Sequence, residues 1–365
     1  MSQKGILVWI AAGIMLLTGG CASTELEQRS FPLAFGADRK PIEQEEETEL
    51  LVVSFDFPDL KQISEKSKTA DTPMGLSLEG KDLYHVEKSY ENNTNRMLDY
   101  NHLKAVIAGE TLISNPWQMC DLLKSWEQEN VGRNISFFIG SPGAAKIMSL
   151  TQETEGSVGK YLEEMEESQQ DFKQEKIVTT GDLINQWHNQ NELLLVPMLT
   201  EAGKRPVISG YGMISDFKYK GMMSVKEAME SFLCTNLLKR FTWEFTTGEV
   251  VEITGIQVEK KIEQVEGLPV ITLNIKGKGR LKTGNPWSLE EKLGLEQRLE
   301  EQLSFSLEET GKTMQELYGI DITNSYISLG GYHRGLYEKY NGFPETYAKE
   351  LHQVFKTEIT FLNWE

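Results

Sequence analysis

The side chains that could bind a metal ion or perform catalysis are few in this 365-residue chain, and they are scattered. The histidines are His85, His102, His188, His333 and His352. No two of them are four residues apart and there is no H-E-x-x-H motif, so a catalytic zinc site has no support. The chain also has no C-x-x-C pair and no G-x-S-x-G motif. We therefore expect no metal site, no cofactor and no catalytic residue.

A further candidate for chemistry is the segment Gly140-Ser-Pro-Gly143, which lies between an expected strand and an expected helix. Backbone N–H groups at such a position can bind an anion, but this segment matches no phosphate-binding loop. Cys120 and Cys234 lie within expected amphipathic helices, where a cysteine behaves as a small hydrophobic residue. We expect core positions rather than ligand platforms for Trp117, Trp126, Trp243 and Trp287.

The first residues have the layout of a bacterial signal peptide. Lys4 is followed by an apolar run from Gly5 to Leu17, which as a helix would reach only about 20 Å, whereas the hydrocarbon core of a membrane is about 30 Å thick. The segment then ends in Gly19-Gly20-Cys21, which resembles the lipobox of bacterial lipoproteins. We therefore expect residues 1–20 to be a signal peptide and Cys21 to be the lipidation site. The alternative is an ordinary secretory signal.

Composition and charge limit the classes of partner. The chain has 39% hydrophobic and 25% charged residues, as globular proteins do. It carries 37 Lys and Arg against 55 Asp and Glu, a formal net charge of -18, so phosphate backbones repel it. We expect no nucleic acid partner, and we expect acyl chains on Cys21 to hold this acidic protein on a membrane.

Strand and helix patterns alternate in the first half of the chain. Strands at 104–111 and 135–140 flank a helix at 116–129 with Asn115 as its expected N-cap, and such a unit predicts a parallel pair of strands. The apolar stripe predicted for this helix is Trp117, Cys120, Leu123 and Trp126. The other predicted elements are a strand at 50–57, a helix opened by Ser141-Pro142, helices within 156–176 and at 183–189, and strands at 193–197 and 206–214.

Antiparallel strands and long helices are predicted for the second half. Ser224 and Glu227 form a capping-box pattern that starts a helix at 225–238. In the expected strand 249–260 the apolar residues shift from odd to even positions, which predicts a bulge at Thr254-Gly255. The leucine-rich pattern that begins after Asn285-Pro286 predicts one long helix or two consecutive helices, with Gly311 as the natural break. The remaining predicted elements are strands at 241–245 and 270–276, a short strand after 320–322 that leads through Gly330-Gly331, a helix at 344–356 and a strand at 357–364.

These patterns predict a multi-domain α+β (mixed α/β) protein. Residues 21–205 would form an N-terminal α/β region. Residues 206–365 would form a C-terminal α+β domain, with a mainly antiparallel sheet packed by long helices.

Several short segments, taken together and in order, are similar to one bacterial family. They are 31–38 (FPLAFGAD), 103–110 (LKAVIAGE), 207–212 (VISGYG), 221–224 (GMMS) with the helix that follows it, and 319–322 (GIDI) with the residues up to Phe355. With Gly19-Gly20-Cys21 before them, the chain resembles the Ger(x)C lipoproteins, or GerAC family, which are the C subunits of spore germinant receptors.

The resemblance implies a protein anchored through Cys21 on the outer face of the spore's inner membrane, without catalytic activity or a cofactor. Its partners would be the membrane-embedded A and B subunits of the receptor, in an assembly that starts germination when nutrients bind. The resemblance identifies neither the nutrient nor a directly bound small molecule. Two alternatives are a solute-binding lipoprotein of an importer and a structural lipoprotein of the cell envelope.

Overall fold

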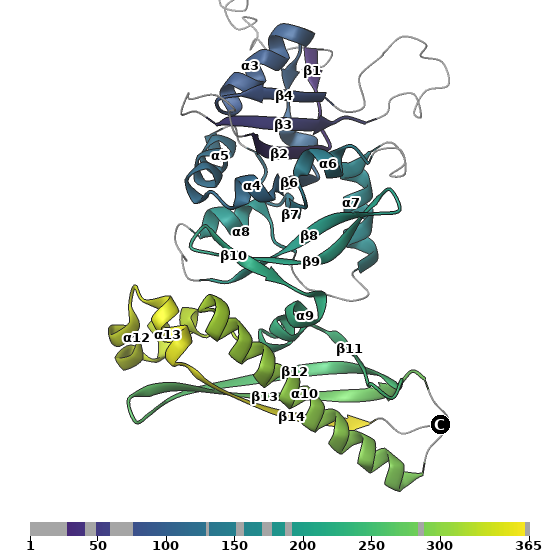
Figure 1. The fold of residues 1–365 in the computed structure, drawn as a ribbon, viewed down its shortest axis with the longest axis vertical. Helices are drawn as coiled ribbons and strands as arrows, with labels where there is room; N and C mark the ends of the chain where they lie inside the picture. The colour runs from purple at the N-terminus through teal and green to yellow at the C-terminus, as the bar shows by residue number, and fades with distance from the viewer. Residues whose placement is uncertain are drawn as a thin grey trace, which may run out of the picture.

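The computed structural model describes residues 28–40, 49–58, 76–128, 131–150, 157–169, 177–186, 192–283 and 288–361. Within these residues the strands form a two-stranded, an eight-stranded and a four-stranded sheet. The eight-stranded sheet and its helices build one end of an elongated molecule, and the four-stranded sheet with a long helix builds the other (Figure 1). The predicted α+β fold with two different parts is confirmed.

The eight-stranded sheet belongs to the N-terminal part and has a parallel centre. Its order is β10-β9-β8-β7-β6-β2-β3-β4; the strands from β8 to β2 pair in parallel, whereas both edges are antiparallel. The predicted parallel pair is confirmed by β6 and β7. The strands are β2 (Ala34–Lys40), β3 (Leu50–Asp56), β4 (Leu76–Gly80), β6 (Ala105–Gly109), β7 (Ser136–Gly140), β8 (Leu194–Ala202), β9 (Arg205–Ser215) and β10 (Lys218–Met223).

Helices cover both faces of this sheet, because alternate residues of its central strands are buried on opposite sides. Phe35 and Val106 pack in one hydrophobic cluster with α3, α4, α5 and α8, whereas Ala34 and Ile107 pack in another with α6 and α7. The helices are α3 (Leu83–Thr94), α4 (Glu110–Ile113), α5 (Pro116–Gln128), α6 (Ala144–Met148), α7 (Val158–Gln169) and α8 (Thr180–Asn185).

Helix α5 occupies the predicted residues, with Asn115 Oδ1 accepting a hydrogen bond from the N–H three residues on at 3.4 Å. Its buried face differs from the predicted stripe: Trp117, expected in the core, is 81% exposed. A repeat of every three residues falls about 60° short of a full helical turn at each step, so Trp117 and Trp126 lie on opposite sides of the helix. Trp126 and Trp243 are buried as predicted, and Trp287 lies outside the described residues. The buried residues of α5 are Met119, Leu122, Leu123 and Trp126.

The N-terminal sheet continues through β10, and the chain then enters α9 (Val225–Cys234). The predicted capping box starts this helix: the Glu227 N–H donates to Ser224 Oγ at 3.3 Å, and the Ser224 N–H donates to the Glu227 carboxylate at 2.8 Å. The predicted division after residue 205 falls at the turn between β8 and β9, two strands of one sheet. We propose a division after Met223, where this sheet ends.

The four-stranded sheet forms the C-terminal part, in the order β11-β12-β13-β14. Its first three strands are antiparallel, whereas β13 and β14 pair in parallel. The predicted bulge is present: the register between β12 and β13 shifts between Thr254 and Gln257, and Gly255 has φ +61°. The strands are β11 (Arg240–Glu244), β12 (Val250–Val265), β13 (Leu268–Leu281) and β14 (His352–Phe361).

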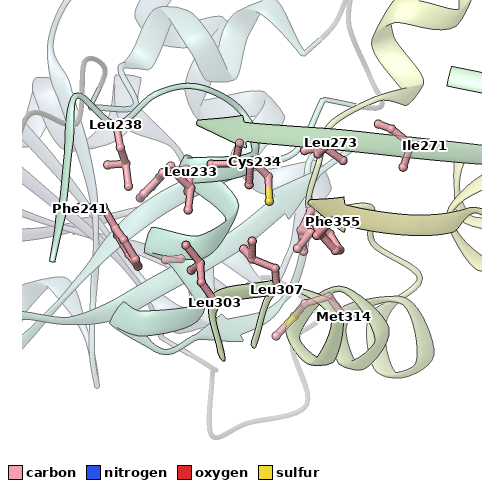
Figure 2. Close-up of a cluster of buried hydrophobic side chains, with 14 of the residues drawn as sticks. Leu233, Cys234, Leu238, Phe241, Ile271, Leu273, Leu303, Leu307, Met314 and Phe355 are labelled. Carbon is pink, nitrogen blue, oxygen red and sulfur yellow. The ribbon is translucent and has the colours of Figure 1, made fainter. Parts of the chain in front are cut away.

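A single helix, α10 (Leu289–Tyr318), covers one face of this sheet, so the alternative of one long helix is confirmed and the break at Gly311 is absent from it. A Cβ atom at residue 311 would lie 2.6 Å from Gln353 Oε1 of β14, so this glycine allows the helix to approach the sheet closely. The helix ends at Gly319, which has φ +64°. Figure 2 shows the core between helix and sheet, which includes Leu303, Leu307, Met314, Ile271, Leu273 and Phe355.

Two predictions near the C-terminus are wrong. The residues after 320–322, expected as a short strand, form a turn, because the Asp321 carboxylate accepts hydrogen bonds from the N–H groups of Thr323 and Ser325 at 2.8 and 2.7 Å. The helix predicted for 344–356 ends at Glu350, since the residues from His352 onward pair with β13. The short helices before β14 are η4 (Tyr326–Ser328), α11 (Leu329–Tyr332), α12 (Arg334–Tyr340) and α13 (Pro344–Glu350).

Candidate functional site

The candidate anion-binding segment at 140–143 is filled by a carboxylate of the chain itself. Asp38 of β2 accepts hydrogen bonds from the N–H groups of Ala144 and Ala145 at 2.8 and 2.6 Å, where α6 begins. Gly109, at the end of β6, leaves room for this carboxylate, since a Cβ atom there would lie 1.8 Å from Asp38 Oδ1. These N–H groups therefore hold α6 on the sheet instead of binding a separate anion.

A second aspartate holds the other helix on this face. Asp56, the last residue of β3, accepts hydrogen bonds from Ser157 Oγ at 2.9 Å and from the Gly159 N–H at 3.0 Å, at the beginning of α7. Burial raises the pKa of the Asp56 carboxyl to about 6, although these hydrogen bonds oppose the change. Asp38 and Asp56 thus position α6 and α7.

The segments that carry the family resemblance build this framework. Phe35, from the first of them, lies edge to face against Phe55 and Trp126. Gly221 has φ +142°, and a Cβ atom there would lie 2.7 Å from the ring of Tyr318. These residue types are therefore required by backbone conformation and close packing, which explains why the resemblance extends along much of the chain.

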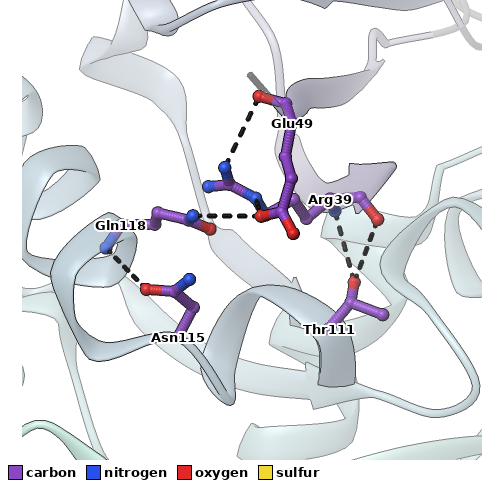
Figure 3. A network of polar contacts seen from close by, with 5 residues as sticks. All are labelled: Arg39, Glu49, Thr111, Asn115 and Gln118. Atoms are coloured by element: carbon purple, nitrogen blue, oxygen red, sulfur yellow. Dashed lines mark hydrogen bonds and ion pairs between the residues drawn. The ribbon is translucent and has the colours of Figure 1, made fainter. Parts of the chain in front are cut away.

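A polar network lies on the surface beside the start of α5 (Figure 3). Arg39 pairs with Glu49, whose carboxylate also accepts a hydrogen bond from Gln118 Nε2 at 3.2 Å. The Thr111 hydroxyl accepts a hydrogen bond from the backbone N–H of Arg39 and donates one to the carbonyl oxygen of Arg39, both at 3.3 Å. The exposed Trp117 precedes Gln118, so this network fixes the segment that presents an aromatic side chain to solvent.

The described histidines and cysteines make local contacts. His85 pairs with Asp82, His102 packs against a phenylalanine ring, and His188 lies outside the described residues. In the described part of the chain no group of three or more His, Cys, Asp or Glu side chains could hold a metal ion. Burial raises the pKa of the Cys234 thiol, which agrees with its predicted place in the core.

The predicted lipidation site, Cys21, lies outside the described residues. The strand β1 (Arg29–Ser30) follows it by eight residues and pairs in parallel with β5 (Met97–Leu98), at the end of the molecule that carries α3 (Figure 1). Among the described helices, none combines the length and the apolar character needed to cross a membrane.

The C-terminal sheet has one covered face and one exposed face. Alternate residues of β13 are buried beneath α10, whereas Lys276, Lys278 and Arg280 lie on the opposite side and are exposed. Lys276 pairs with a glutamate of β14 at 3.2 Å, while Lys278 and Arg280 have no ion pair with any described residue. At the short helices beside this sheet, Tyr332 and Phe343 are 85% and 63% exposed. Charged and aromatic side chains therefore face solvent at this end.

Comparison with known proteins agrees with this architecture. The family model of the spore germination protein N-terminal domain matches residues 22–201. The crystal structure of the GerBC protein has a similar fold, with a TM-score of 0.61 and 16% identity over 91% of this chain and 98% of that chain. No curated protein matches the sequence. Residues 22–201 therefore belong to the N-terminal domain family of the GerAC spore germination proteins.

Proposed function

We propose that this chain is the C subunit of a germinant receptor, anchored by lipid on Cys21 at the outer face of the spore's inner membrane and assembled with the membrane-embedded A and B subunits. The observation that carries the proposal is the match of residues 22–201 to the spore germination domain. The fold similarity to GerBC over 91% of the chain supports it. In this role the protein acts by binding and positioning its partners, without catalysis.

The anchor limits how the body can lie on the membrane. Acyl chains on Cys21 would keep β1, and with it β5 and α3, within about 29 Å of the lipid surface. The C-terminal sheet forms the opposite end of the molecule (Figure 1). If the long axis of the molecule stands upright on the membrane, a partner that contacts the exposed face of that sheet does so with a part that extends away from the membrane.

Replacing Cys21→Ala tests the anchor. We expect the variant to be lost from the membrane fraction of spores and nutrient germination to fall, because each buried CH₂ of an acyl chain contributes about 0.8 kcal/mol. Cys120→Ala, at a half-buried cysteine in α5, is the matched control and should leave the protein in the membrane fraction. A Cys21→Ala protein that stays with the membrane and supports germination would contradict the anchoring role.

A further inference from the structure

A cavity of about 240 Å³ lies at the junction of the two parts of the molecule. Its wall comes from α8 and β8 on the N-terminal side, and from α9, β12 and the residues after α10 on the C-terminal side. Much of the wall is apolar: Leu193, Leu195, Phe232, Leu237 and Ile327. A ligand in this cavity therefore needs an apolar body, and it would contact both parts of the molecule.

Lys260 of β12 brings a positive charge to this wall. Its Nζ donates a hydrogen bond at 2.6 Å to the carbonyl oxygen of Thr323, a fully buried residue. Among the described residues, no carboxylate oxygen lies within 4.0 Å of this ammonium group. Lys260 as a whole residue is exposed, but desolvation of its ammonium group lowers its pKa more than the charge of Asp321 raises it, so the positive charge is incompletely balanced. An ammonium group has three donors, and two of those of Lys260 have no acceptor among the described residues, so they face the cavity or solvent.

The other polar groups of the wall already have partners. Asp182 is held in the capping box of α8, and Ser231 Oγ donates to the carbonyl oxygen of Ile322 at 3.0 Å. Asn324 Oδ1 accepts a backbone N–H at 3.2 Å. Asp182 and Glu192 are among the residues that line the cavity, so a dianion such as a phosphate ester would lie near two negative charges. A single negative charge beside Lys260 is the better match.

We propose that this cavity binds a small aliphatic monocarboxylate. The carboxylate pairs with the Lys260 ammonium, and the hydrocarbon body lies against Leu195 and Phe232. Because the wall is shared, the bound molecule stabilises the contact between the N-terminal sheet and α9. This inference goes beyond the proposed receptor role and does not depend on it.

Calorimetric titration of the full chain in detergent with sodium pentanoate tests the proposal, with titration into detergent alone as the blank. We expect saturable binding at one site per chain, and binding of pentan-1-ol about tenfold weaker or more, since hydrogen bonds to charged groups are worth about 1.5–3 kcal/mol. Lys260→Met, which keeps an unbranched side chain without its charge, should weaken pentanoate binding by a similar factor. Lys261→Met is the matched control, because Lys261 is the next residue of β12 and pairs with Glu263 at 2.8 Å.

A second variant separates loss of binding from loss of folding. Ile327 is 52% exposed at the wall of the cavity, so Ile327→Trp narrows the cavity with little effect on the core, and pentanoate binding should fall. Absence of pentanoate binding by the native chain, equal binding by native and Lys260→Met chains, or preference for pentylamine would each overturn the proposal. The titration uses the purified chain without receptor partners. Its result is therefore independent of the proposed receptor role, and either proposal can be wrong while the other holds.

Discussion

The two large sheets of this molecule use their faces differently. Helices cover both faces of the N-terminal sheet, where Asp38 and Asp56 hold the beginnings of α6 and α7. The C-terminal sheet is covered by α10 on one face only, and its other face exposes Lys278 and Arg280. The carboxylates of Asp38 and Asp56 thus bind groups within the N-terminal part, whereas the side chains of Lys278 and Arg280 face solvent, where a partner could contact them. We expect substitutions at the two aspartates to change stability and substitutions on the exposed face to leave it unchanged.

The largest expected effect is the pH dependence caused by Asp56. Its carboxyl has a pKa of about 6 in the folded protein against 3.8 ordinarily, so the folded state binds this proton more tightly than the unfolded state. The stabilising contribution is complete below pH 3.8 and is lost as the pH rises to about 6, by about 3 kcal/mol in total. Urea unfolding between pH 4 and 7 measures it.

Asp56→Asn should remove this pH dependence of the free energy of unfolding, because the amide side chain stays neutral between pH 4 and 7. Glu259→Gln, at an exposed residue of β12, is the control and should leave the slope unchanged. If the free energy of unfolding of Asp56→Asn still falls as the pH rises, another group causes the pH dependence.

Gly109→Ala should destabilise the N-terminal part by about 2 kcal/mol. The added Cβ would lie 1.8 Å from Asp38 Oδ1 and would push the carboxylate away from the N–H groups of α6. Gly294→Ala is the contrasting variant in α10, where a Cβ atom meets nothing within 4 Å, and it should stabilise the protein by about 0.5–1 kcal/mol. Denaturant midpoints compare the two, and equal changes would refute the close contact.

Asp38→Ala should cost about 1 kcal/mol, the usual effect of losing a side chain that accepts from the N–H groups at the start of a helix. Asp38→Asn keeps one acceptor and should cost less. Hydrogen exchange at Ala144 and Ala145, whose N–H groups donate to Asp38, checks the mechanism directly. Unchanged exchange in Asp38→Ala would contradict it.

The smallest effect is expected on the exposed face of the C-terminal sheet. Lys278→Glu and Arg280→Glu should change the free energy of unfolding by less than about 0.5 kcal/mol, since neither residue has an ion pair among the described residues. A loss above 1 kcal/mol in thermal unfolding would mean that this face supports the fold after all.

Features that depend on neighbouring residues could be predicted from the sequence. The capping box of Ser224 and Glu227 and the bulge at Thr254-Gly255 are of this kind, and both are present. Two of the errors arise from contacts between residues that are distant in the sequence. Gly311 stays helical where α10 packs against Gln353, and the residues from His352 onward become a strand because β13 pairs with them.

The role of Asp38 could not be predicted for the same reason. Its partners Ala144 and Ala145 lie more than a hundred residues away in the chain, at separations of 106 and 107. The Gly140-Ser-Pro-Gly143 segment indicated that an anion could bind there. It did not indicate that this anion is the carboxylate of Asp38. The exposure of Trp117 could have been predicted by counting helical turns. Lipidation of Cys21 stays a prediction.

The receptor role is tested most directly by purifying this protein from detergent-solubilised inner membranes of dormant spores and identifying what accompanies it by mass spectrometry. The account predicts recovery of two multi-spanning proteins, one with a large soluble domain and one resembling an amino-acid transporter. Recovery of an importer's permease and ATPase, or absence of the protein from spores, would contradict it.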